Sequence, residues 1–114
     1  METNYKELDE KVNSLLMEFG EKNPGIIKGF MQMHKTMDDE GALSPKIKEL
    51  ISLSIAVVVK CEGCVAHHMN KALDCGASHA EIVEAIGVSV CMGGGPALVY
   101  ASIAVKALSD FEGK

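Results

Sequence analysis

Apolar positions recur at helical spacing along the first third of the chain. Residues 4–19 form an amphipathic pattern, and Gly20 predicts the end of that helix. A second pattern begins at Asn23-Pro24, where proline suits the first turn, and ends before Gly41. His34 lies beside its apolar face, and a single histidine there predicts a packed or solvated side chain. These positions carry the two apolar faces: Leu8, Val12, Leu15, Leu16 and Phe19, then Ile26, Ile27, Phe30, Met33 and Met37.

Ser44-Pro45 predicts the start of a third helix, with serine as the N-cap and proline at the first helical position. This helix runs to about Lys60, and its second half holds only Ser52 and Ser54 as polar residues. A helix that is apolar on every side is expected to be buried on every side. Residues 57–59 are all valine and favour a strand by propensity. No partner strand is predicted elsewhere, so we expect a helix.

Three more helices are predicted in the second half of the chain. One runs from about residue 61 to 74, one opens at the capping box Ser78-x-x-Glu81, and one runs from Pro96 to about Leu108. Residues 85–105 carry no charge, which is typical of a membrane span, but the central glycines and proline leave each half too short. The glycines predict a tight turn or a close helix contact. Small residues that would permit close approach are Ala97, Ala101, Ser102 and Ala104.

The pattern therefore predicts an all-α fold, a compact bundle of about six helices in one domain spanning residues 1–114. Its core must come from aliphatic residues, alanine and methionine, because 47% of the chain is hydrophobic, with no tryptophan and few aromatics. Such long apolar stretches in a small domain predict a homo-oligomer whose subunits share core-like surfaces. The net charge of −5 and the spread of acidic residues disfavour nucleic acid and anionic membranes as partners.

Two thiols and two imidazoles lie within residues 61–68, in the sequence Cys-Glu-Gly-Cys-Val-Ala-His-His. A Cys-x2-Cys pair at the start of a helix can form a disulfide with little backbone movement. The positive end of the helix also favours the reactive thiolate. Four cysteines without the features of a signal or transit peptide predict a cytoplasmic location and catalytic or metal-binding thiols.

Helical geometry places Cys61, Cys64 and His68 on one stripe and His67 on the other side of Cys64. His68, one turn beyond Cys64, can act as a base or proton donor to that sulfur. We therefore assign Cys64 as the attacking thiol and Cys61 as the resolving thiol. The reverse assignment stays open, because Cys61 lies nearer the helix N-terminus. Glu49 lies on the preceding, largely apolar helix. Its protonation state is expected to depend on the balance between burial, which disfavours the charged carboxylate, and hydrogen bonds, which favour it.

The spacing Glu-x11-Cys-x2-Cys-x3-His, formed by Glu49, Cys61, Cys64 and His68, resembles the motif of the alkylhydroperoxidase D-like branch of the carboxymuconolactone decarboxylase family. The similarity extends from about Pro24 to the C-terminus. It implies an all-helical homo-oligomer, a trimer or hexamer, that needs no cofactor. It also implies that Cys64 reduces a hydroperoxide, that Cys61 closes the disulfide, and that Glu49 and His68 relay protons.

One position departs from the pattern of the best-known peroxidases of this branch. They carry a histidine directly before the second cysteine, and here that residue is Gly63. The proton relay is then either shorter or completed by His67 from the opposite side. The decarboxylases that name the family generally lack the cysteine pair, so a decarboxylase-like lyase is a weaker alternative.

Other functions use the same residues differently. The pair could exchange with a small disulfide, or with a dithiol reductant of lipoyl or thioredoxin type, without reacting with peroxide. A non-enzymatic scaffold with an unused cysteine pair is a further alternative. A structural zinc site could draw on Cys61, Cys64 and Cys75, with His68 or His79, but Cys75 is expected about 16 Å from Cys64 along the helix. Cys75 and Cys91 are expected to be packed as small apolar residues.

Overall fold

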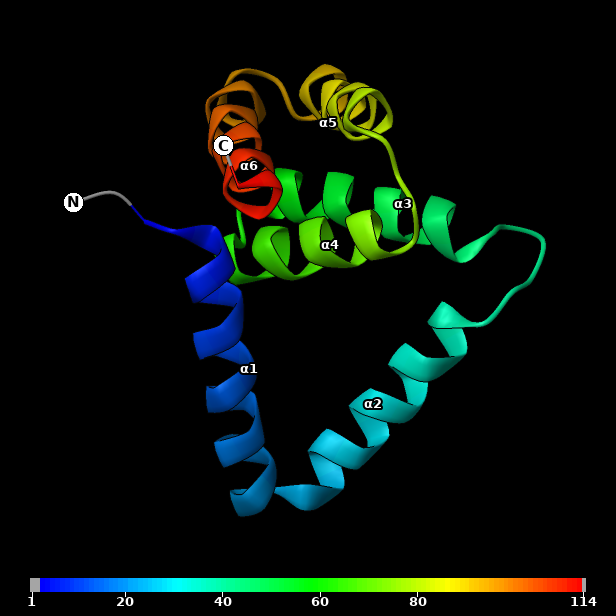
Figure 1. Cartoon of the computed structure of the whole chain (residues 1–114). Helices are drawn as coiled ribbons and strands as arrows, with labels where there is room; N and C mark the ends of the chain where they lie inside the picture. Colours follow the sequence, from blue (N-terminus) through cyan, green and yellow to red (C-terminus); the bar gives the residue numbers. More distant parts are fainter. Residues whose placement is uncertain (1–2, 114) are drawn as a thin grey trace.

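The computed structural model describes residues 3–113, and within them the chain forms six α-helices and no strand (Figure 1). The predicted all-α fold with six helices is confirmed. The helices are α1 (Tyr5–Lys22), α2 (Pro24–Asp38), α3 (Pro45–Val59), α4 (Glu62–Asp74), α5 (His79–Gly93) and α6 (Gly95–Glu112).

Helices α3, α4, α5 and α6 form the core of the molecule. Helix α3 packs along α4 and α5, and α5 and α6 cover the same side of the α3–α4 pair (Figure 1). Many of the buried residues are alanine, which lets the helices approach one another closely. The fully buried larger side chains are Leu53, Val57, Val65, Met69, Ile82 and Leu108.

Helices α1 and α2 form a V that extends away from this core (Figure 1). Tyr5 fixes the start of α1, since its backbone N–H donates to Asp110 Oδ2 at 2.8 Å and its hydroxyl donates to Glu62 Oε2 at 3.4 Å. Burial, with the nearby Glu62 carboxylate, raises the pKa of Tyr5 to about 12. The neutral phenol therefore links α1 to α4 over the whole physiological pH range.

Two helices are longer than the sequence predicts. Gly20 does not end α1, which continues to Lys22. A Cβ added at Gly20 would lie 3.3 Å from Ile27 Cγ1, so the glycine lets α2 approach α1 closely. Helix α6 likewise continues past Leu108 to Glu112. At the predicted glycine turn, an added Cβ at Gly93 would lie 2.6 Å from Ala97 Cβ, so close approach of α5 and α6 requires glycine there.

Much of the apolar surface is uncovered in the single chain. Helix α3 was expected to be buried on every side, but Ile51, Ile55 and Val59 are exposed because no element between residues 3 and 113 covers that face. Cys75 and Cys91 were expected to be packed, and both are exposed free thiols: Cys75 caps α4, and Cys91 lies on the outer side of α5. Within residues 3–113 no helix is both long and apolar enough to cross a membrane.

Candidate thiol–disulfide site

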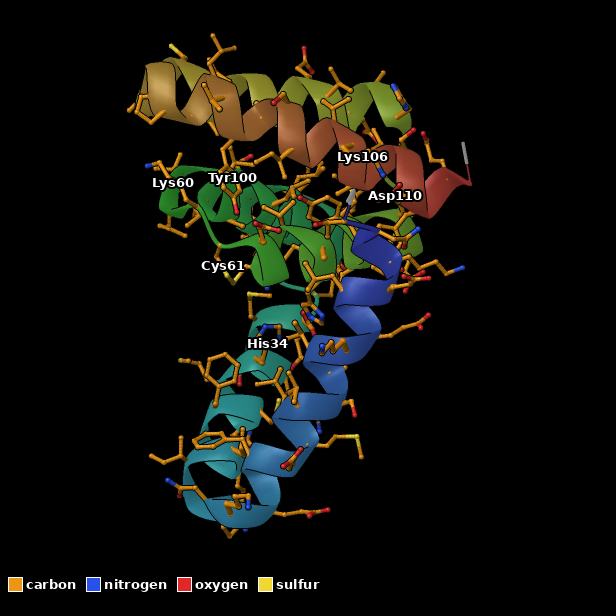
Figure 2. All side chains as sticks on the ribbon, turned by 90° about the vertical axis from the view of Figure 1, so that its left-hand side faces the viewer. His34, Lys60, Cys61, Tyr100, Lys106 and Asp110 are labelled. Atoms are coloured by element: carbon orange, nitrogen blue, oxygen red, sulfur yellow. A yellow bond between two sulfur atoms is a disulfide. The ribbon has the colours of Figure 1, made fainter. Side chains whose placement is uncertain are left out.

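Cys61 and Cys64 form a disulfide at the N-terminus of α4 (Figure 2). Their Cα atoms are 5.2 Å apart, within the usual range for this bond. Cys61 is the N-cap of α4, with extended backbone angles, and its sulfur accepts a hydrogen bond from the Cys64 N–H at 3.2 Å. Helix α4 therefore begins one residue later than predicted. Helical spacing relates Cys64, His67 and His68 to one another, whereas Cys61 lies outside the helix.

A tight connection between α3 and α4 sets the position of Cys61. Lys60 adopts the left-handed conformation (φ 59°, ψ 49°), which costs a non-glycine residue about 1 kcal/mol. Its N–H donates to the carbonyl of Val57, and the Cys61 N–H donates to the carbonyl of Ala56, both at 3.2 Å. Because this turn reverses the chain within two residues, α4 runs back along α3.

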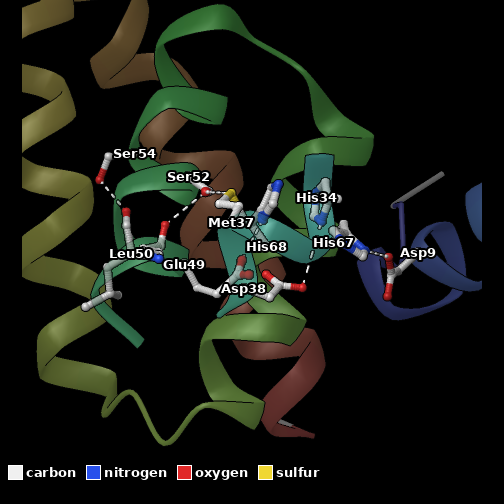
Figure 3. Close-up of polar contacts among 11 residues, drawn as sticks. Asp9, His34, Met37, Asp38, Glu49, Leu50, Ser52, Ser54, His67 and His68 are labelled. Carbon is white, nitrogen blue, oxygen red and sulfur yellow. Dashed lines mark hydrogen bonds and ion pairs between the residues drawn. The ribbon is translucent and has the colours of Figure 1, made fainter. Parts of the chain in front are cut away.

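The reversal brings Glu49 of α3 against His68 of α4. His68 Nδ1 lies 2.7 Å from Glu49 Oε1, and the glutamate is only 3% exposed (Figure 3). A carboxylate accepts the hydrogen bond, so the proton sits on Nδ1 and Nε2 stays free as a base. This is the geometry in which a buried carboxylate fixes the tautomer and orientation of an imidazole.

His67 is paired with a second carboxylate, from α1. His67 Nδ1 lies 3.5 Å from Asp9 Oδ1, and Asp9 is 4% exposed (Figure 3). The other oxygen, Oδ2, accepts a hydrogen bond from Asn70 Nδ2 at 3.2 Å. Burial and the neighbouring His68 lower the pKa of His67, while Asp9 acts in the opposite direction. His67 therefore holds a proton less firmly than a free imidazole does.

His34 of α2 completes a cluster of three imidazoles. Its ring stacks on His68 with centroids 5.9 Å apart, and it meets His67 edge-on at 6.0 Å. The rings of His67 and His68 are 5.0 Å apart. Histidine thus reaches the site from two helices, α2 and α4.

The imidazole cluster and the cysteine pair open into one cavity of about 360 Å³ between α1, α2 and α4. Apart from the cysteines, the histidines and Asn13, its lining is apolar or glycine, so a small, weakly polar molecule fits it best. The residues that line it are Val12, Asn13, Leu16, Phe30, Met31, His34, Cys61, Gly63, Cys64, His67 and His68.

The structure brings the predicted site residues together. Cys61, Cys64, His67 and His68 line the cavity, and Glu49 lies behind His68. The roles assigned to them stay predictions. His34 and Asp9 were not predicted as site residues. Asp9 had a usable signal, because it falls on the same side of α1 as Val12 and Leu16, where an apolar residue is expected.

The residues of the zinc alternative do not converge. Cys61 and Cys75 cap opposite ends of α4, and His79 Nδ1 instead lies 3.1 Å from Glu112 Oε1. Across residues 3–113, no group of three or more histidine, cysteine, aspartate or glutamate side chains is arranged to hold a metal ion.

The chain is similar along nearly its whole length to two curated proteins. It is 32% identical over 112 residues to an uncharacterised protein of Cupriavidus necator, covering 98% of this chain and 96% of that one. It is 31% identical over 103 residues to an uncharacterised protein of the cox locus of Paracoccus denitrificans, covering 90% and 93%.

Two solved structures share the fold. A carboxymuconolactone decarboxylase family protein from Legionella pneumophila superposes with a TM-score of 0.89 at 33% identity, covering 94% of this chain and 96% of that one. A family member from Thermotoga maritima, described as a candidate for the antioxidative response, superposes with a TM-score of 0.83 at 26% identity, covering 92% and 90%.

The model of the carboxymuconolactone decarboxylase family matches residues 24–107. This match spans α2 to α6 and includes Glu49, both cysteines of the disulfide and the three clustered histidines, but not α1. The chain therefore belongs to the carboxymuconolactone decarboxylase family.

Proposed function

We propose that this protein is a thiol-dependent peroxidase of the alkylhydroperoxidase D-like branch, with Cys61 and Cys64 as its redox pair. One observation carries the proposal. The Cys61–Cys64 disulfide lies in a cavity beside His68, and the buried Glu49 holds that imidazole in a fixed tautomer. A dithiol next to an oriented base is suited to reversible oxidation.

The first half of the reaction uses the Cys64 thiol. His68, one turn beyond Cys64, accepts the thiol proton, and the thiolate attacks the terminal oxygen of the hydroperoxide. A sulfur–oxygen bond forms, the oxygen–oxygen bond breaks, and the departing alkoxide takes the proton back from His68. Cys64 is left as a sulfenic acid and the substrate as an alcohol.

In the second half, the Cys61 sulfur attacks the Cys64 sulfur and displaces the hydroxyl as water. The Cys61–Cys64 disulfide is the bond that this step would form, and its presence supports the proposal. A dithiol reductant of lipoyl or thioredoxin type then restores the two thiols. The apolar cavity favours small hydroperoxides, and the description of the Thermotoga relative is in line with this activity.

A second candidate function is dithiol–disulfide exchange without peroxide. Gly63 favours it, because the best-known peroxidases of the branch carry a histidine there. A decarboxylase-like lyase is a weaker candidate, since the decarboxylases that name the family generally lack the cysteine pair that lines this cavity.

The test is to count free thiols by mass spectrometry before and after one equivalent of hydroperoxide, for the reduced wild type and for Cys64→Ser. Peroxidase chemistry predicts rapid loss of two thiols as a Cys61–Cys64 disulfide, absent from the variant. Oxidation by lipoyl or glutathione disulfide but not by hydroperoxide would favour the exchange function. If neither oxidant acted and zinc were released by a chelator, the redox function would be wrong.

A further inference from the structure

The site holds two carboxylate–imidazole pairs, and the function proposed above uses only one. Glu49 and His68 are supplied by α3 and α4, whereas Asp9 and His67 are supplied by α1 and α4. In both pairs a carboxylate faces the Nδ1 of the histidine (Figure 3). The hydrogen bond to Glu49 leaves Nε2 as the free nitrogen of His68, and the carboxylate of Asp9 facing Nδ1 favours the same tautomer in His67.

The residue spacing on α4 places the two histidines on either side of Cys64 around the helix axis. His67 and His68 follow Cys64 by three and four residues on α4, so each is one turn away and they flank it. Both line the same cavity as the cysteine pair. Helix α1 packs against α4 on the side that carries His67.

Gly63 permits the close contact with α1 that brings Asp9 to His67. A Cβ added at Gly63 would lie 3.4 Å from Val12 Cγ2, at the lower edge of ordinary contact. Val12 is one turn after Asp9 on α1, and Gly63 is one turn before His67 on α4. A larger side chain at Gly63 would push apart the two helices that form the Asp9–His67 pair. The position that departs from the family pattern thus supports a second imidazole.

Stability alone does not account for Asp9. Among the described residues, Asp9 Oδ1 is the buried side-chain oxygen without a hydrogen-bond partner, and it faces His67 at 3.5 Å. An incompletely satisfied buried carboxylate costs stability, and an apolar residue on that side of α1 would pack without the cost. A carboxylate kept there is explained by what it does to His67.

We propose that Asp9 and His67 form a second proton relay for the Cys61–Cys64 pair, with Asp9 as the positioning residue and His67 as the group that moves the proton. This inference rests on the proposed redox function and deepens it. It also makes α1, which lies outside the residues matched by the family model, a part of the active site.

The stoichiometry of the reaction gives each relay one proton. Oxidation of two thiols by a hydroperoxide yields a disulfide, an alcohol and water, so two thiol protons move to two leaving oxygens. His68 transfers the Cys64 proton to the alkoxide. His67 accepts the Cys61 proton at Nε2 and passes it to the hydroxide that leaves Cys64. With a disulfide as oxidant, the same two protons go to its two sulfurs.

The charges around His67 suit a base. Burial and His68 lower its pKa most, Lys71 and His34 lower it further, and Asp9 alone raises it. These groups come from the three helices that meet at His67: α1, α2 and α4. Loss of the Asp9 charge therefore lowers the pKa of His67 further, and the pH above which the base is available falls with it.

The first experiment uses the oxidised wild type as isolated. Nitrogen-15 NMR of the imidazoles, at a pH where His67 is neutral, reports which nitrogen carries the proton. The proposal predicts the proton on Nδ1, facing Asp9, with Nε2 unprotonated. A proton on Nε2 of His67 would overturn the proposal, and this result does not depend on any variant or on peroxidase activity.

The second experiment follows disulfide formation in reduced Asp9→Asn as a function of pH, with hydrogen peroxide and with oxidised lipoic acid. Loss of the positioning charge should slow the reaction about tenfold and move its rising limb to lower pH. Glu10→Gln removes the same charge from an exposed neighbour on α1 and should behave as wild type.

The outcomes separate this inference from the proposed function. Fast oxidation by peroxide with an unchanged pH profile in Asp9→Asn would overturn the relay and leave the peroxidase standing. No reaction with peroxide, but a slowed and shifted reaction with lipoic acid, would support the relay and overturn the peroxidase. If Asp9→Asn did not fold, His67→Gln would take its place. The rise of the oxidation rate with pH that depends on His67 should then be lost.

Discussion

At the scale of single residues, Glu49 is the side chain whose replacement tests the main relay most directly. Glu49→Gln keeps the shape of the side chain and removes the charge that holds His68 Nδ1 at 2.7 Å. Since oriented general bases contribute roughly 10²–10⁴-fold to rate, we expect thiol oxidation by hydroperoxide to slow by about 10²-fold. Stopped-flow measurement of thiol loss gives the rate. Glu84→Gln, an exposed site on α5, is the matched control, and equal rates in the two variants would exclude a role for Glu49.

Residue spacing predicted part of this site and missed the rest for a physical reason. Glu49, Cys61, Cys64, His67 and His68 lie on two helices joined by a tight turn, so their order in the chain is close to their order in space. His34 reaches the cavity from α2 and Asp9 reaches His67 from α1, so their positions depend on how the V of these helices folds back onto α4. Spacing within one helix carries no information on that angle. Cys75 and Cys91 have apolar neighbours in the sequence and were therefore predicted to be buried. Both are exposed in one chain.

At the scale of helices, the start of α4 depends on a cap that the redox chemistry also uses. Cys61 Sγ accepts the Cys64 N–H, as a serine hydroxyl would. Cys61→Ser and Cys61→Ala both lack the disulfide, so the difference between them isolates the cap. We expect Cys61→Ser to be more stable by about 1 kcal/mol, measured as free energy of unfolding in urea. Equal stabilities would mean that the helix start is held by the α3–α4 turn alone.

The contact between α5 and α6 gives a second prediction at this scale. A Cβ at Gly93 would lie 2.6 Å from Ala97 Cβ, so Gly93→Ala forces the helices apart and should cost about 1–3 kcal/mol. Gly87→Ala on the same helix meets nothing within 4 Å and should stabilise by about 0.5–1 kcal/mol, because alanine favours the helix. Denaturation midpoints that moved in the same direction would contradict the assigned contact.

At the scale of the whole molecule, the uncovered apolar surface is the feature that a single chain leaves unexplained. A groove of about 430 Å³ runs between α3 and α5, and exposed apolar residues also follow α1 and α2. The sequence predicted burial of α3 on every side because the second half of this helix is almost entirely apolar. One chain leaves part of α3 exposed, and a second copy of the chain would cover that part. The main residues that line the groove are Ile47, Ile51, Ile55, Val58, Val88 and Met92.

We therefore expect a homo-oligomer that buries this groove, and the family resemblance implies a trimer or hexamer. Ile55 of α3 and Val88 of α5 both line it and are 56% and 60% exposed in one chain. Charged residues cannot be buried there without a partner, so Ile55→Lys and Val88→Lys should dissociate the assembly while α3 and α5 stay helical. Light scattering after size exclusion gives the mass, and Asp39→Lys on an exposed loop is the control. Because the groove lies away from the cysteine cavity, the dissociated variants should keep a titratable Cys61–Cys64 pair. A wild type that ran as a monomer would mean that this surface serves another partner.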